Sequence, residues 1–600
     1  MALNDVYTSA VEYFNPPPSL VPKNSFQSLR FLRWDLLSGA VMTPIAFVFA
    51  LSISNIAHMT LMSGIMIGIL ACIIMRILGG TYLCIAGAAA ALAPILAEAV
   101  DKLGGGNLVL GQQLVSAVIL TAGIGMLLIG VLRLARFTSV VSHAVVAGSI
   151  HGPIGLSIWV KQIPSFYGVH FADNTLSGIV RDVVTLKHLD QINWVLMTIG
   201  LVTLAVILCH SFIQKRLVHS SSPLKTIFGV LPPQLFATGA ALLMGYFVVM
   251  GHGNYIQLPD HPFEGHTDFG WVAIKHIWDN PDLWQQYGIS SLKLTMVDTI
   301  EICATVYGID MLDKYRRASN PNKVLVAMAL SNIIGSTLTP VHTQSANPGG
   351  IKSSTSAFLG TKTLNAALFC ALFMLFSVAN PSARSVINHM PLVALSAIIA
   401  YTGWRLCAPA AWMHFYKMGR DPFIVFAGGF VLSAATGEIL IGFFSAIAIE
   451  FVLSYLRVYH TAQRHVHAGV ETNPMAVFKK IFRNPVVSAE MKEDGTFFVK
   501  LNGPLTTFNR RHLPVCPEGA RELFIDASHP EVTFIDYSTE GLFRQLRESC
   551  CGKGHFKLYG FKPASRRGGH GSGLVSYERR GEQIGTYVAR CRRTGGQGLA

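Results

Sequence analysis

Two polar interruptions in otherwise apolar stretches hold the residues best suited to chemistry. Residues 345–363 bring small polar groups and one cation, Lys352, into one stretch, and residues 79–87 interrupt another in the first half of the chain. Hydrocarbon offers no partner to a free N–H or C=O, so such backbone survives in a bilayer only where it is buried in protein or lines a cavity. Paired broken segments in two halves are typical of the substrate site of a secondary transporter.

A carboxylate lies inside a third apolar stretch. Glu301 would sit at membrane depth, where a charge is costly enough to make it a functional candidate. Thr305, one turn later, falls on the same helix face. Sodium prefers several hard oxygens, which Glu301, Thr305 and freed carbonyls could supply, and protonation of Glu301 is the other option. A structural contact with Lys352 also stays open, whereas Asp298 is expected at the outer interface.

Composition places these residues in a membrane protein. Only 13% of the 600 residues are charged, against about 25% in ordinary soluble domains. Apolar stretches long enough to cross ~30 Å of hydrocarbon as helices recur from about residue 35 to 458. Much of the net charge of +14 falls in short loops and in the tail, so it indicates topology rather than nucleic-acid binding. The cysteines and histidines show no spacing typical of a metal site.

Fourteen membrane helices are predicted from these stretches. They lie near residues 35–54, 57–78, 84–99, 111–132, 139–161, 193–213, 226–250, 289–311, 322–338, 347–359, 363–379, 390–408, 421–436 and 438–458.

The loops between these helices predict the orientation of the chain. The loops that follow even-numbered helices contain Lys or Arg, whereas the odd loop at 251–287 carries five acidic residues against Lys275. Positive charge favours the cytoplasmic side. The N-terminus, the even loops and the C-terminal region are therefore expected in the cytoplasm, with the protein in a bacterial inner membrane or a plasma membrane.

The two interruptions fall in the third and tenth helices, seven apart. That spacing predicts a seven-plus-seven inverted repeat, in which two half-helices point their N-termini at each other near the membrane midplane. Free N–H groups and the positive end of the helix dipole attract an anion there. Asn347, Gly349 and Gly350 would form one mouth of this site, because glycine permits close approach of the backbone.

Several motifs resemble the SulP (sulfate permease) family of anion transporters over nearly the whole chain. They are Trp34-Asp35-Leu36-Leu37-Ser38-Gly39-Ala40 with Pro44 to Ala50, Val145-Val146-Ala147-Gly148 with Lys161-Gln162-Ile163-Pro164, Asn320-Pro321-Asn322-Lys323 with Ser331-Asn332, and His389-Met390-Pro391-Leu392. Their order and spacing carry the resemblance more than any single motif does.

The resemblance implies roles for residues around the anion site. Lys352 takes the place of the arginine common in the family's tenth helix, and a lysine lacks the bidentate fork that suits oxyanions. Residues 84–90 stand where relatives usually read Gly-Pro-Thr after a small residue, and Ala88 and Ala89 lack the proline and the hydroxyl of that motif. Phe47 and Phe49 would make the pocket less polar still. Glu301 matches the acidic residue that helps to hold sodium in sodium-coupled relatives.

The residues after 460 predict a soluble region. Segments near 497–501, 523–528 and 556–560 have the pattern of strands that alternate with helices, which indicates a small α/β domain, similar to the STAS domain of the same family. The chain would thus divide into a cytoplasmic segment 1–34, a transmembrane domain 35–460, a STAS-like domain 461–564 and a basic disordered tail 565–600, which could touch anionic lipid.

The sequence therefore predicts a secondary active transporter and not an enzyme. The expected substrate is a small inorganic anion of the bicarbonate or sulfate class, moved with sodium or protons by elevator-like or rocking motion, with no cofactor besides a possible coupling Na⁺. The resemblance implies a homodimer. Two alternatives stay open: transport of an organic solute such as an organic cation held by aromatic faces, and a channel or non-transporting sensor.

Overall fold

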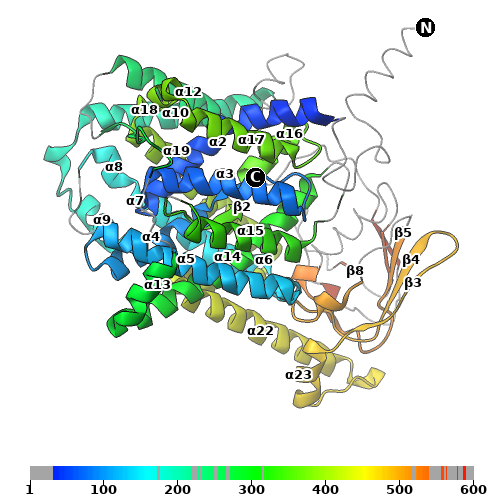
Figure 1. Ribbon diagram of the computed structural model, residues 1–600. Coiled ribbons are helices and arrows are strands. Elements are labelled where there is room, and N and C mark those ends of the chain that lie inside the picture. Colours follow the sequence, from blue (N-terminus) through cyan, green and yellow to red (C-terminus); the bar gives the residue numbers. More distant parts are fainter. Residues whose placement is uncertain are drawn as a thin grey trace, which may run out of the picture. The chain divides into compact units, whose positions relative to one another are not determined.

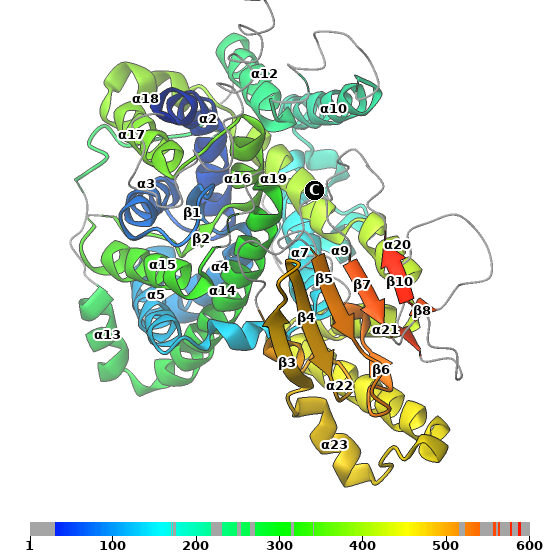
Figure 2. The ribbon, with the colours of Figure 1, turned by 90° about the vertical axis from the view of Figure 1, so that its right-hand side faces the viewer.

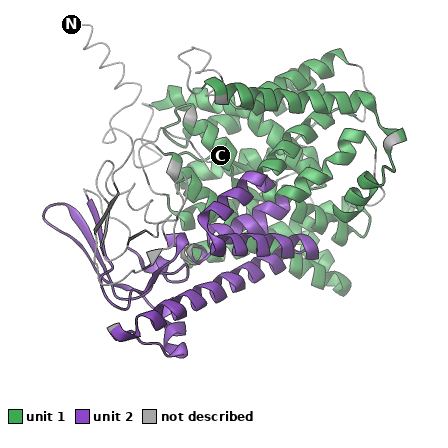
Figure 3. Cartoon of the chain, turned by 180° about the vertical axis from the view of Figure 1, so that it is seen from behind, with its two compact units in different colours: residues 1–135, 155–405 green, residues 136–154, 406–600 purple. Residues whose placement is uncertain are grey.

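The computed structural model describes residues 31–169, 171, 176–217, 228, 231–248, 254–264, 270–313, 317, 319–339, 341–514 and 522–539, and four short strands at 556–559, 562–563, 577–578 and 586–589. The chain divides into two compact units (Figure 3). Unit 1 comprises residues 1–135 and 155–405, and unit 2 comprises residues 136–154 and 406–600.

Unit 1 is helical, apart from two short strands (Figures 1 and 2). Its helices are α2 (Leu32–Ile56), α3 (Leu61–Leu78), α4 (Ala93–Gly104), α5 (Leu108–Val131), α7 (Gly152–Lys161), α8 (Ile163–Tyr167), α9 (Leu176–Val184), α10 (Trp194–Leu217), α12 (Pro233–Phe247), α13 (Gly270–Asp279), α14 (Trp284–Leu312), α15 (Pro321–Thr337), α16 (Gly350–Phe358), α17 (Asn365–Ala379), α18 (Pro381–Asn388) and α19 (Leu392–Cys407).

Local sequence signals start several of these helices. The Asn107 side chain accepts a hydrogen bond from the amide of Leu110 at 3.2 Å and caps α5. Asn320 caps α15 in the same way, and Pro321 follows it in the first turn. An Asn cap satisfies an amide that the helix itself leaves unpaired, and proline there sacrifices no hydrogen bond. α15 therefore begins within one residue of its predicted start.

Seven helices of the described residues are long and apolar enough to cross a membrane. The number rises to eight if α17 and α18, which meet at a bend of 88°, count as one broken span. Most other predicted spans correspond to shorter helices, such as α12 and α15. The 29-residue α14 is long enough, but Lys293, Asp298, Glu301 and Asp310 make it polar.

Two predicted helices differ from the structure at their N-terminal ends. Residues 84–99 were expected to be one helix, but β1 (Ala86–Ala88) precedes a turn of 3₁₀ helix and α4 starts only at Ala93. In the other half, β2 (Ala346–Pro348) precedes α16. The run of alanines led to the wrong prediction of a continuous helix, because alanine favours a helix. Pairing of β1 with β2 instead requires extended backbone at these residues.

Unit 2 combines one short segment from the first half of the chain with the last helices of the chain. Its helices are α6 (His143–Val146) with a π-helical turn at Ala147–His151, α20 (Pro409–Met418), α21 (Arg420–Thr436), α22 (Ile439–Arg464) and α23 (Pro474–Phe482). Gly148 lies so close to α21 that a Cβ atom there would come within 2.3 Å of the Phe426 carbonyl oxygen. Only glycine permits that approach.

A five-stranded sheet follows in the same unit. Its order is β10-β7-β5-β4-β3, with β4, β5 and β7 parallel and both edge strands antiparallel (Figure 2). The strands are β3 (Val486–Met491), β4 (Thr496–Leu501), β5 (Glu522–Asp526), β7 (Phe556–Tyr559) and β10 (Thr586–Ala589), and a smaller sheet pairs β6 (Phe534–Ile535), β9 (Tyr577–Glu578) and β8 (Lys562–Pro563). The strands predicted near 497, 523 and 556 are confirmed.

The predicted tail differs from the structure at two places. β9 and β10 lie inside residues 565–600, where the sequence predicts disorder, and β10 pairs with β7 from Thr586↔Tyr559 to Ala589↔Phe556. The apolar pair Tyr587-Val588 was too short a strand signal among the glycine and arginine residues around it. The rest of the tail and residues 1–30 of the predicted N-terminal segment lie outside the described residues.

Candidate functional site

The two interruptions meet in unit 1 as a pair of antiparallel strands. Ala86 pairs with Pro348, Gly87 with Asn347 and Ala88 with Ala346. α4 follows β1 and α16 follows β2, so each half of the chain supplies a strand that leads toward the N-terminus of a short helix (Figure 2). The prediction that residues 79–87 and 345–363 come together is confirmed. Pairing satisfies the broken backbone of both segments, as a membrane interior requires.

Lys352 lies in the first turn of α16 and points back to β1. Its ammonium donates a hydrogen bond to the Ala86 carbonyl at 3.0 Å, and the residue is buried, with 6% exposed. A Cβ atom on Gly87 would come within 2.4 Å of the ammonium nitrogen, and Gly87 has φ of +154°. Glycine at position 87 thus makes room for the cation as well as for an unusual backbone.

No carboxylate neutralises Lys352 among the described residues. Its electrostatic neighbours are the thiols of Cys72, Cys370 and Cys84, and Cys72 Sγ lies 3.4 Å from the same Ala86 carbonyl oxygen. An isolated buried cation is costly unless it finds a counter-ion. The site therefore favours an anion beside Lys352, and the expectation that Lys352 could instead pair with Glu301 finds no contact in the structure.

A buried polar network connects β2 to α14 and α15. Asp298 of α14 is fully buried, with 0% exposed, and accepts hydrogen bonds from Ser345 Oγ at 2.6 Å and from Asn347 Nδ2 at 3.0 Å. Asn332 of α15 donates to Ser345 Oγ at 2.9 Å and accepts from the amide of Ala346 at 2.7 Å. The network fixes the register of β2 against two helices.

The sequence did not identify this role of Asp298. It was expected at the interface because it lies nearer the start of its helix, but α14 begins five residues earlier than predicted, which moves Asp298 deeper into the helix. Asn332 was noticed only as part of a motif. The signal that could have found both is the recurrence of polar residues at helical spacing in otherwise apolar helices.

Glu301 lies one turn after Asp298 on α14, close enough for the two carboxylates to repel each other. Its Oε2 atom is buried and has no hydrogen-bond partner within the described part of the chain. Asn347 Oδ1 and Thr299 Oγ1 are also buried there without a partner. Oxygen atoms without donors are the groups that bind a hard cation or an added proton.

Thr305 lies near the mouth of α16. A Cβ atom on Gly350 would be 3.7 Å from the Cγ2 atom of Thr305, so α14 and α16 approach each other at these two residues. Gly349, which precedes α16, lies against β1, because a Cβ atom there would meet the Ile85 carbonyl oxygen at 2.8 Å. Three of the predicted residues, Gly349, Gly350 and Lys352, are thus brought together by the start of one helix.

The four apolar candidates are all buried. Ala88 and Ala89 flank the end of β1, with 7% and 5% exposed. Phe47 and Phe49 lie within α2 and are also buried. Two positions apart on an α-helix correspond to a rotation of about 200°, so these rings face nearly opposite directions. The roles of Phe47 and Phe49 in the binding pocket therefore stay a prediction.

The C-terminal end of α16 is anchored to α2. The Asp35 carboxylate accepts hydrogen bonds from the amides of Lys362 at 2.9 Å and Thr363 at 3.2 Å. Ser38 Oγ and Ser356 Oγ lie 2.9 Å apart, and Thr361 Oγ1 donates to Ser38 Oγ at 2.6 Å. These contacts hold the C-terminal end of α16, while the pairing of β2 with β1 holds its N-terminal end.

The comparisons with known proteins agree with this fold. The profile of the Sulfate permease family matches residues 32–429, and the chain belongs to that family. Probable sulfate transporter 3.5 of Arabidopsis thaliana is 25% identical over 467 residues, which cover 74% of this chain and 67% of the relative. Bicarbonate transporter BicA of Picosynechococcus sp. is 21% identical over 380 residues, 62% of each chain.

Solved structures extend the likeness to the whole fold. The transmembrane domain of a cyanobacterium bicarbonate transporter BicA has a TM-score of 0.53 at 18% identity and covers 70% of this chain and 98% of that one. The overall structure of SLC26A9 has a TM-score of 0.59 at 14% identity and covers 91% and 87%. This protein is thus a multi-pass membrane protein of a transporter family, and its relatives are not enzymes.

Proposed function

We propose that the protein is a secondary active transporter of a small inorganic anion of the bicarbonate or sulfate class. The observation that carries this proposal is the buried ammonium of Lys352, which no described carboxylate neutralises, at the N-terminus of α16. A full charge and the positive end of a helix dipole act there together on one anion. The relatives named above, a sulfate transporter and a bicarbonate transporter, agree with that substrate class.

Coupling to a cation is part of this proposal. Glu301 Oε2 and Asn347 Oδ1 are buried acceptors without a donor among the described residues. Asn347 of β2 also donates a hydrogen bond to Asp298, which lies on the same helix as Glu301. A sodium ion or a proton beside Glu301 would reduce the repulsion between the two carboxylates. Occupancy of this place would then favour the arrangement of β2 and α16 that receives the anion, which is the coupling that symport needs.

The wider arrangement follows from the same reasoning. We infer that the protein lies in a cell membrane with its N- and C-termini in the cytoplasm. We further propose a homodimer in which each chain has fourteen spans in two inverted repeats and a STAS-like C-terminal domain. Transport is expected to proceed by elevator-like alternating access. The organic-cation alternative is disfavoured, because Lys352 would repel a cation at close range.

Uptake into proteoliposomes tests the proposal. The purified protein would be supplied with labelled bicarbonate, sulfate and chloride, and with a labelled organic cation, each with and without an inward sodium gradient and an inward proton gradient. Saturable uptake of an inorganic anion, raised by one of the two gradients, is the expected result. Saturable uptake of the organic cation alone, or uptake of nothing in protein that is folded and oriented, would overturn it.

A further inference from the structure

A second buried charged cluster lies in unit 2, where α22 contacts the α/β region that follows it. Glu450 of α22 is 2% exposed, and Asp536, which follows β6, is 3% exposed. Thr507 Oγ1 lies 3.1 Å from Glu450 Oε1 and 2.8 Å from Asp536 Oδ2. Two buried carboxylates thus share one hydroxyl group, although a hydroxyl has a single proton to donate.

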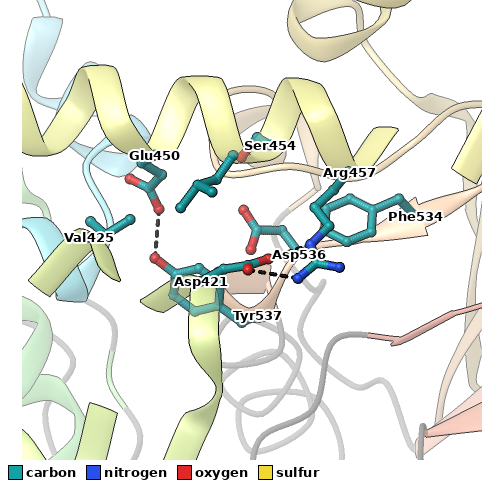
Figure 4. A pocket seen from close by; sticks show the side chains of 9 residues that line it. Asp421, Val425, Glu450, Ser454, Arg457, Phe534, Asp536 and Tyr537 are labelled. Carbon is teal, nitrogen blue, oxygen red and sulfur yellow. Dashed lines mark hydrogen bonds and ion pairs between the residues drawn. The ribbon is translucent and has the colours of Figure 1, made fainter. Parts of the chain in front are cut away.

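A small cavity adjoins these groups. It measures about 10 Å³, close to the volume that one water molecule needs, and its lining includes Glu450, Asp536 and Tyr537 (Figure 4). Tyr537 donates a hydrogen bond to Glu450 Oε1 at 2.8 Å. Glu450 Oε2 is buried and has no hydrogen-bond partner among the described residues, so the carboxylate that lines this cavity is only half satisfied.

The surrounding charges do not neutralise both acids. Asp421 of α21, which also lines the cavity, forms a two-point ion pair with Arg457 of α22, both contacts at 2.8 Å. Among the described residues, the remaining cation near the pair is Arg510, which donates to the carbonyls of Ser538 and Val141, each at 3.0 Å, and acts electrostatically on both Glu450 and Asp536. One negative charge is left, which one proton would neutralise.

Within the described ranges, the neighbouring elements supply no further charge to Glu450. Ser142, which caps α6, lies 3.3 Å from the Tyr537 hydroxyl and contributes a neutral hydroxyl. The ring of His143 packs against Phe415, with ring centroids 5.5 Å apart. Burial also raises the pKa of Asp536 above its usual value, against the hydrogen bonds from Thr507 and Ser538, and raises the pKa of Tyr537 well above 10, so Tyr537 remains a donor.

We propose that Glu450 and Asp536 bind one shared proton, and that this proton stabilises the contact of the Thr507 and Asp536 loops with α22. With the proton on Glu450, its carboxyl group donates to Thr507 Oγ1 and Thr507 donates to Asp536, so every short contact has a donor. Without it, two charges face each other across a hydroxyl that can serve only one of them. The contact is therefore a proton-binding site. With the C-terminal region in the cytoplasm, as proposed above, the two loops respond to cytoplasmic pH.

The sign of the effect follows from proton linkage. The closed contact binds one proton more than the open one, so closure is favoured at low pH and weakens as pH rises through the pKa of the closed pair. The apolar cluster around it, which includes Val458, Phe508 and Phe534, is unaffected by pH. We therefore expect local opening of the two loops rather than separation of the region from α22.

Hydrogen exchange of the full-length protein in nanodiscs tests this proposal. The amide of Thr507 donates to Asp536 Oδ2 at 3.3 Å and the amide of Asp536 donates to the Leu505 carbonyl at 2.8 Å, so both report on opening. After correction for the intrinsic effect of pH, their protection in the wild type should fall as pH rises, by up to about tenfold per pH unit between the pKa of the open carboxyl group and that of the closed pair, and should level off above the latter. Glu450→Gln should remove that slope, because its side chain is neutral at every pH.

Three further variants make the result decisive. Asp536→Asn should remove the slope as well, which covers the case in which Glu450→Gln fails to fold. Tyr537→Phe should lower protection but keep the slope, because it removes a donor and no ionisable acid. Glu493→Gln, at an exposed position between β3 and β4, should behave as the wild type.

Two outcomes would overturn the proposal. One is an unchanged pH slope in both Glu450→Gln and Asp536→Asn. The other is a protection that changes when sodium is replaced by potassium or choline at fixed pH, since the cavity would then hold a metal cation instead of a proton.

Discussion

Two buried charged sites, Lys352 in unit 1 and the pair of Glu450 and Asp536 in unit 2, have opposite signs and opposite deficits. In unit 1, Lys352 is a lone cation whose described polar partner is one carbonyl oxygen. In unit 2, Glu450 and Asp536 are two acids with too few protons between them. The hydroxyl groups of Thr507, Tyr537 and Ser538 surround the acids, whereas thiols surround the lysine. The first cluster lacks an anion and the second lacks a proton.

This difference teaches how each cluster can act. A thiol is a weak hydrogen-bond partner, so the surroundings of Lys352 leave its charge available to a ligand that comes and goes. Hydroxyl groups are strong partners that can either donate or accept, so the surroundings of Glu450 and Asp536 can stabilise two protonation states of one fixed contact. The first arrangement suits transport, and the second suits regulation.

The largest effect is expected from removal of the cation. Lys352→Met keeps most of the side-chain length but no charge, so the dipole of α16 alone would supply only about half an elementary charge. Saturable anion uptake into proteoliposomes should fall to background, and Lys352→Ala should do the same. The matched control is Lys275→Met on the exposed face of α13, which should transport normally. Normal uptake by Lys352→Met would contradict the role of this lysine in binding.

A partial loss is expected when the proposed coupling residue changes. Glu301→Gln keeps volume and hydrogen bonding but removes the ionisable group, so accumulation driven by a gradient should fail while exchange of labelled anion across the membrane continues. Both processes can be measured in the same vesicles. Accumulation at the wild-type level would place Glu301 among the purely structural contacts.

Thr305→Ala separates the two coupling ions. If Thr305 is a sodium ligand, the sodium concentration needed for half-maximal uptake should rise, by about tenfold if one ligand is worth ~1.4 kcal/mol. If Glu301 carries a proton, sodium dependence is absent in the wild type and the variant should match it. Anion affinity measured at saturating sodium serves as the control for indirect damage to α16.

Disruption of the polar network that connects β2 to α14 and α15 should affect the stability of the protein more than its affinity for the anion. Asp298→Ala leaves the Ser345 hydroxyl and the Asn347 amide without their acceptor, at about 1–3 kcal/mol for each buried donor. The Tm of the detergent-solubilised protein should drop clearly. Asp101→Ala, which removes an exposed ion pair with His58, is the control and should cost no more than about 1 kcal/mol. Equal losses in both variants would contradict the structural role of Asp298.

The sequence predicted the parts of the site that depend on local signals. Glycines and polar residues in apolar stretches marked both broken segments, and the start of α15 followed from Asn320 and Pro321. Pairing of β1 with β2 could not be derived locally, because Ala86 and Ala88 favour a helix when taken alone. The burial of Asp298 likewise depends on helices that meet from distant parts of the chain.

The cluster in unit 2 was hidden for a related reason. Glu450 lies inside a helix that was predicted to end at residue 458 and continues to Arg464, and its partners come from segments 57 and 87 residues away. Nothing in the spacing of these residues indicates that Thr507 lies between the two acids, because that contact depends on how the loops after β4 and β6 fold.

The smallest effect is expected from shortening the tail. Deletion of residues 565–600 removes β9 and β10 and leaves β7 as an edge strand, so the C-terminal sheet should lose protection from hydrogen exchange at residues 556–559. Anion uptake should stay at the wild-type level, because Lys352, Glu301 and their described contacts all lie in unit 1. Deletion of residues 590–600 alone, which keeps β10, controls for the loss of basic residues and should leave the protection of β7 unchanged. Loss of uptake in the longer deletion but not in the shorter one, at equal expression, would show that the edge strand β10 is needed for transport.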